Sequence, residues 1–131
     1  MKQNLVTKKE RLDDNSVFLK KFIKGIEGGR TLDVTGYTKE VIPCGTVIAS
    51  KTVGGEKTYF PLPIVEDAYR ALNRDNNEAY EGLLVASILA EKPAAAILTW
   101  GIVNGAALPC PVPADFKTAL PHIDYQIDEE A

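Results

Sequence analysis

The apolar stretch ILTWGIVNGAALP, residues 97–109, is broken repeatedly by residues that favour turns. It stops at Gly101, resumes, stops again at Asn104-Gly105, and ends at Pro109. Glycine allows unusual backbone conformations and close backbone approach, and proline cannot donate a hydrogen bond within a sheet. A chain interrupted in this way favours short strands joined by turns over long helices.

The composition is that of one globular domain: 131 residues, of which 45% are hydrophobic and 25% are charged. A chain of this length buries about two thirds of its unfolded surface, so a core can form without metal or disulfide support. No apolar run approaches the roughly 20 residues of a membrane-spanning helix. Residues 1–16 lack the apolar segment of a secretory signal. We therefore expect no membrane partner, and Cys44 and Cys110 as free thiols.

Charge is distributed unevenly along the chain. The first 30 residues hold eight Lys or Arg and four Asp or Glu, a net charge of +4, whereas residues 31–131 carry a net charge of −7. We predict a basic extended N-terminal arm over residues 1–30 and a β-rich domain over residues 31–131. An arm of this kind is suited to an acidic protein surface. A net charge of +4 is weak evidence for binding to nucleic acid, so nucleic acid is disfavoured as a partner.

Runs of β-branched and aromatic residues between turn signals predict the strands. They cover residues 17–26, 31–37, 41–53, 57–60, 82–90, 94–103 and 122–127. The third run should break at Pro43 and Gly45, and Gly54-Gly55 should turn it into a hairpin with the fourth. The runs 82–90 and 94–103 should be neighbouring antiparallel strands.

Two segments predict short helices. In residues 63–73 the apolar positions recur at helical spacing, Pro63 suits a first turn, and Glu66 and Asp67 favour a helix start. Residues 114–120 can form two turns before the following proline. The predicted fold is mainly β with one or two short helices (α+β), as a compact β-barrel-like or β-sandwich domain.

The residues that usually carry chemistry do not form a recognisable set. His122 is the only histidine and has no nucleophile near it in sequence, although pairing with Cys44 or Cys110 in space stays open. One histidine, two distant cysteines and scattered carboxylates give no metal-ligand spacing. Trp100 fits a core or a subunit interface better than a base-stacking platform. We assign no catalytic, cofactor-binding or metal residue, and expect no cofactor and no enzymatic activity.

Residues 81–127 carry an ordered set of features. Two apolar strands are followed by Gly-Ile-Val-Asn at 101–104, Ala-Ala-Leu-Pro at 106–109, a short helix, and Leu-Pro-His-Ile at 120–123 leading into a last strand. In this order they resemble the head-fibre and head-decoration proteins of tailed phages, particularly the short kind in phages of Bacteroides-type bacteria. Residues 30–50 resemble them more loosely. Cys110, within PCPVP, matches no family role.

The resemblance implies a structural virion protein on the outer surface of an icosahedral capsid, made in the host bacterial cytoplasm. Such proteins form homotrimers that bind the major capsid protein as head decoration, or form the base of a fibre and meet fibre or receptor-binding proteins. Their N-terminal arm can add a strand to a neighbouring sheet. The alternative is a small β-domain that binds a ligand, or an enzyme, with an unrecognised site.

Overall fold

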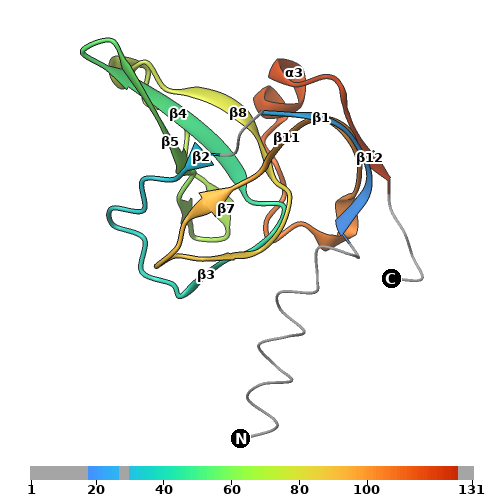
Figure 1. Cartoon of the computed structure of the whole chain (residues 1–131). Coiled ribbons are helices and arrows are strands. Elements are labelled where there is room, and N and C mark those ends of the chain that lie inside the picture. Colours follow the sequence, from blue (N-terminus) through green and yellow to red (C-terminus); the bar gives the residue numbers. More distant parts are fainter. Residues whose placement is uncertain (1–17, 27–29, 127–131) are drawn as a thin grey trace, which may run out of the picture.

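The computed structural model describes residues 18–26 and 30–126 and consists mostly of β-strands (Figure 1). The predicted fold class, a β-rich domain with little helix, is confirmed. Most strands are short because turn residues interrupt the apolar runs, as the sequence predicted. Residues 1–17 and 27–29 of the predicted arm lie outside the described residues, as does Ile127 of the predicted last strand.

One six-stranded sheet organises the domain. Its main path, in spatial order, is β1 (Leu19–Gly25), β11 (Ile97–Asn104), β8 (Ala79–Leu84), β4 (Val47–Val53) and β5 (Glu56–Pro61). The sixth strand, β12 (Ile123–Gln126), pairs in parallel with the second half of β11, while the other pairs in this sheet are antiparallel. β11 therefore contacts three strands, and β1, β11 and β12 lie together on one side of the domain (Figure 1).

Three two-stranded ladders and three short helices complete the described fold. The ladders are β2 (Arg30–Thr31) with β10 (Ala94–Ala95), β3 (Val41–Ile42) with β9 (Ile88–Leu89), and β6 (Ile64–Val65) with β7 (Ala68–Tyr69). The helices are the 3-10 turns η1 (Arg74–Asn76) and η2 (Gly105–Ala107) and the α-helix α3 (Ala114–Ala119).

Two hydrophobic clusters form the core. The larger one contains Phe18, Val103, Phe116 and Ile123, all buried, and joins the start of β1 to β11, α3 and β12. The smaller one packs residues of β3, β4, β8 and the segment 94–97 around the bridge residue Leu32. Burial of aliphatic and aromatic side chains in these clusters is the main stabilising contribution to the fold.

Several predicted elements are confirmed. β1 lies within the predicted strand 17–26, although the sequence also placed these residues in the arm, and β1 pairs with β11 along its length. The run 41–53 divides into β3 and β4 at 43–46, where Gly45 has a φ of 85°. Gly54 and Gly55, with φ of 61° and 84°, form the turn of the β4–β5 hairpin. The helix at 114–120 and the last strand are present as α3 and β12.

The predicted helix over 63–73 is wrong, because this segment folds as the β6–β7 hairpin. Its two-residue turn, Glu66-Asp67, has φ of 54° and 65°, which no right-handed helix allows. Tertiary contacts outweigh the helical spacing: the Tyr69 hydroxyl accepts a hydrogen bond from the Val47 N–H at 3.2 Å, and the Arg70 N–H donates to the Pro63 carbonyl at 3.0 Å. Helix propensity is a weak preference that such contacts override.

The runs 31–37 and 82–90 are shorter as strands than predicted. After β2 and a single bridge at Leu32, the Asp33 side chain accepts hydrogen bonds from the hydroxyl and the N–H of Thr35, closing a local turn. These bonds lower the pKa of Asp33 to about 2. The run 82–90 begins in β8, which pairs antiparallel with β11 as predicted, but two of its later residues form β9 and pair with β3.

The β6–β7 turn offers a stabilising substitution. Replacing Glu66-Asp67 by Asn-Gly, as Glu66→Asn with Asp67→Gly, is expected to raise the free energy of unfolding by about 1 kcal/mol, because this pair accepts positive φ at both positions. Urea denaturation measures the change. The matched control is Glu91→Asn with Lys92→Gly, where neither residue has a positive φ. Equal stabilisation by both double variants would contradict the role of the turn.

Candidate functional site

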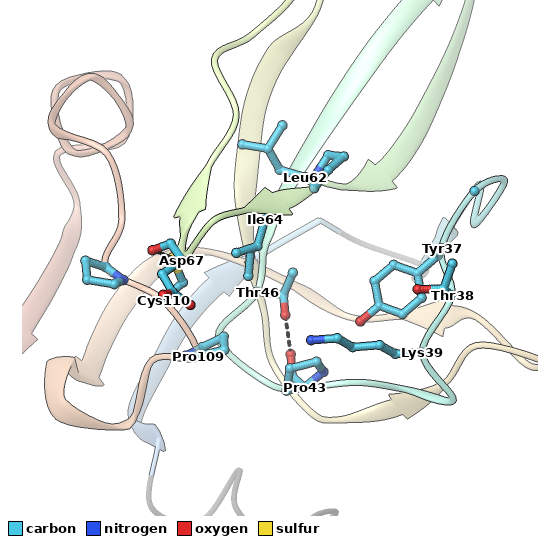
Figure 2. Close-up of a pocket in the computed structure, with 13 residues that line it drawn as sticks. Tyr37, Thr38, Lys39, Pro43, Thr46, Leu62, Ile64, Asp67, Pro109 and Cys110 are labelled. Atoms are coloured by element: carbon cyan, nitrogen blue, oxygen red, sulfur yellow. Dashed lines mark hydrogen bonds between the residues drawn. The ribbon is translucent and has the colours of Figure 1, made fainter.

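An open pocket of about 390 Å³ lies where four chain segments meet (Figure 2). The segments are the loop 36–39, the 43–46 connection between β3 and β4, residues 62–67 at the β6–β7 hairpin, and the proline-rich stretch 109–111. The side chains that line it are apolar or proline in equal number to polar ones, and the polar ones are Tyr37, Thr38, Lys39, Thr46, Asp67 and Cys110. Its size is within the range of small-molecule sites.

Three of the polar side chains of the pocket are engaged with the backbone. The Tyr37 hydroxyl donates to the Val41 carbonyl at 3.1 Å, and the Thr46 hydroxyl donates to the Pro43 carbonyl at 2.6 Å (Figure 2). The Cys110 thiol donates to the Asp67 carbonyl at 3.2 Å. These bonds hold the loops together. Thr38, Lys39 and Asp67 also line the pocket, so a ligand would meet both apolar side chains and two charged ones (Figure 2).

Tyr69 supports the hairpin beside this pocket. Its ring packs against the larger core cluster, and its hydroxyl accepts the hydrogen bond from Val47 at the start of β4. Burial raises the pKa of Tyr69 to about 12. The phenol therefore stays protonated at neutral pH and acts as a structural contact between β7 and the main sheet.

The residues considered for catalysis make different contacts. Cys44 and Cys110 are both buried as free cysteines, and the Cys44 N–H donates to the Ser87 hydroxyl at 2.9 Å. His122 lies beside Trp100 instead, with ring centroids 5.4 Å apart. Within residues 18–26 and 30–126, no group of three His, Cys, Asp or Glu side chains could hold a metal ion, and no helix is long and apolar enough to cross a membrane.

Trp100 lies on the surface of β11, so the core location considered for it is wrong; its role at a subunit interface stays a prediction. The neighbouring strand β1 presents Phe22 and Ile23 to solvent as well. The exposed fractions are 49% for Phe22, 43% for Ile23 and 45% for Trp100. Exposed apolar side chains that gather in this way mark interaction surfaces.

Three lysines flank Phe22 and Ile23 on β1, and we call the whole set the basic aromatic patch. The patch consists of Lys20, Lys21, Phe22, Ile23 and Lys24 on β1, Trp100 on β11, and His122 beside it. All five β1 members are exposed. Lys24 is the register partner of Trp100, and Lys21 is the register partner of Ile102 two residues further along β11.

Two glycines let β1 approach β11 closely at this patch. A Cβ on Gly25 would meet the Ile97 carbonyl, and a Cβ on Gly101 would meet the Lys21 carbonyl. The β1–β11 pairing also contains three register shifts, so its residues do not alternate cleanly between the two faces. This irregular pairing explains why the sequence of β1 showed neither a clean alternation nor a helical stripe.

Sequence reasoning missed the patch because its members come from three separate segments. The available signal was the lysine-rich, aromatic string KKFIK at 20–24, which has no apolar period that would place it in a core. The pocket had no signal of this kind, since the loops that form it are placed by long-range contacts. No protein-family model, no curated protein and no solved structure matches the chain.

Proposed function

We propose that this protein is a structural virion protein that binds the outside of an icosahedral phage head, as head decoration or as the base of a head fibre. The partner is the major capsid protein, and the active form is a homotrimer that can also carry fibre or receptor-binding proteins. The proposal is supported by the resemblance of residues 81–127 to such proteins, and by the position of these residues at the centre of the main sheet.

The resembling residues build the centre of the main sheet and the path that leads to its last strand. The Asn104 side chain at the end of β11 accepts a hydrogen bond from the Ala106 N–H at 3.0 Å and caps η2. The proline-rich stretch then leads to α3, whose Phe116 is fully buried, and the chain returns as β12 beside β11. The residues that carry the resemblance therefore have structural roles in the core of the fold. This supports a protein that acts through its surface.

The second candidate is a small ligand-binding or catalytic β-domain, with the pocket of Figure 2 as its site. The size of the pocket favours it. The engagement of Tyr37, Thr46 and Cys110 with backbone carbonyls argues against it, because it leaves Thr38, Lys39 and Asp67 as the polar side chains of the lining that could recognise a ligand. We therefore rank it second.

Co-sedimentation with phage capsids tests the proposed function. We expect the full chain to bind saturably to capsids that lack their decoration protein, and to have the mass of a trimer by light scattering, either free or after release from the shell. Capsids whose decoration sites are already occupied serve as the control and should bind none. A monomer that does not sediment with undecorated capsids, even at low salt, would contradict the proposal.

A further inference from the structure

β1 is an edge strand of the main sheet. It pairs with β11 on one side, and no strand lies along its outer side in the part of the chain that the structure describes. An edge strand presents unpaired N–H and C=O groups to which another chain can add. Five consecutive residues of β1, 20–24, are exposed, so both this edge and the side chains around it are accessible to a partner.

The lysines of β1 give this edge a positive charge. Among the described residues, no carboxylate forms an ion pair with Lys21 or Lys24. Lysines elsewhere in the sheet differ, since Lys51 pairs with Asp33 at 3.2 Å and Lys57 pairs with Glu81 at 3.0 Å. The edge is therefore complementary to carboxylates supplied by another molecule.

Apolar side chains complete the patch. Half of the six large hydrophobic residues that are exposed in the described chain lie here: Phe22, Ile23 and Trp100. The Trp100 ring rests against the His122 ring at an interplanar angle of 39°, which restricts its motion. Tryptophan is enriched among the residues that contribute most to binding energy, and an anchored ring loses less entropy on docking.

We propose that the basic aromatic patch is the surface through which this protein docks onto an acidic face of the major capsid protein. The inference rests on the proposed function and names its contact surface. The outer edge of β1 meets the backbone of the partner, the lysines pair with its carboxylates, and Trp100 enters an apolar recess between them. Charge sets the encounter rate, and the buried tryptophan sets the lifetime of the complex.

Two other partners fit the patch less well. A second copy that paired through its own β1 would bring the lysines of the two edges together, and lysines on an edge oppose such self-pairing. Nucleic acid would suit aromatic rings and lysines, but it cannot add a strand to the open edge of β1, whereas a polypeptide can. An acidic protein surface satisfies the charge and the apolar side chains together.

Patch variants of the full chain test this inference in the co-sedimentation assay. The charge-reversed variant Lys21→Glu with Lys24→Glu should bind capsids at least about tenfold more weakly at low salt, and its affinity should depend less on salt. Its matched control, Lys39→Glu with Lys92→Glu, has the same net charge and reverses two exposed lysines elsewhere. The control should bind within about twofold of the wild type.

The apolar part of the patch is tested separately. Trp100→Ser should weaken binding at least about tenfold at low and at high salt, whereas Val65→Ser, which alters another exposed apolar residue, should bind like the wild type. Amine labelling of the wild-type protein needs no variant. On capsids Lys21 and Lys24 should be protected, while Lys39 and Lys92 should react as in the free protein.

The outcomes separate the two proposals. Wild-type binding that both patch variants leave unchanged, with Lys21 and Lys24 still reactive on the capsid, would overturn the docking surface and leave the proposed function standing. No wild-type binding would overturn the proposed function and this partner with it. Charge reversal that dissociates the free oligomer would assign the patch to a second copy. Tight binding of single-stranded DNA, lost in the patch variants while capsid binding persists, would assign it to nucleic acid.

Discussion

Gly82→Ala is expected to lower the free energy of unfolding by about 3 kcal/mol. Gly82 lies in β8 between β4 and β11, opposite Ile48. A Cβ there would run into the Leu98 carbonyl and would lie 2.7 Å from Cγ2 of Ile97. Because β8 is paired on both sides, its backbone cannot move away from β11 without weakening the ladder with β4. Urea denaturation of the variant measures the loss.

The matched control is Gly54→Ala in the β4–β5 turn. It makes the same chemical change and restricts the unfolded chain equally. Gly54 has a φ of 61° and no atom within 4 Å of an added Cβ, so only the backbone conformation is penalised, at about 1 kcal/mol. Equal losses for the two variants would contradict the steric explanation at Gly82.

Arg70→Met is expected to cost about 3 kcal/mol near neutral pH. Arg70 donates from Nη1 to Oε1 of Glu78 at 2.8 Å and from Nη2 to Oε2 at 3.1 Å. The side chain of Glu78 is only 3% exposed and accepts one further hydrogen bond, from the Asn73 N–H. Without Arg70, a buried carboxylate keeps a single donor and loses its counter-charge.

The pH dependence of this effect follows from the pKa of Glu78. Hydrogen bonds from Arg70 are the main cause that lowers this pKa below its ordinary value of 4.5. The stabilisation is thus fully present above the unfolded pKa and is lost as the pH falls through the lower, folded one. The difference between wild type and Arg70→Met should therefore shrink from neutral pH to about pH 3, as measured by urea denaturation at both.

Lys57→Met is the control for this pair. Lys57 also contacts a glutamate, Glu81, at 3.0 Å, but its side chain is 48% exposed. The side chain of Glu81 is 15% exposed and keeps a hydrogen bond from the Ser50 hydroxyl, so loss of this partly exposed pair should cost less than about 1 kcal/mol. A loss for Arg70→Met that is no larger than this, or that is the same at both pH values, would show that the Arg70–Glu78 pair contributes little.

The elements predicted correctly from sequence are those specified by local signals. The β4–β5 hairpin follows from Gly54-Gly55 between two β-rich runs, and α3 follows from a short helical pattern between prolines. β12 follows from the alternation in residues 122–127. In each case a turn or a proline defines the boundary, so neighbouring residues suffice.

The elements predicted wrongly depend on distant partners. In residues 63–73 the helical spacing was real, but the bond between Tyr69 and Val47 and the core packing of Tyr69 favour a hairpin. In residues 82–90, the predicted strand is interrupted and β9 pairs with β3, which no local signal reveals. The candidate sites share this property, since both the pocket and the basic aromatic patch combine residues that lie far apart in sequence.

The central position of β11 has a consequence for folding kinetics. Leu19, near the start of the described chain, pairs with Val103, and Gln126, at its end, pairs with Asn104. Both ends of the described chain therefore pair with the same strand, which is synthesised late. Most contacts in the sheet join residues that are far apart in sequence. Topologies of this kind fold slowly, because long loops must close before any pairing compensates their entropy. On the ribosome, β1 emerges early with its apolar residues unprotected, and the sheet closes only after synthesis has passed β12.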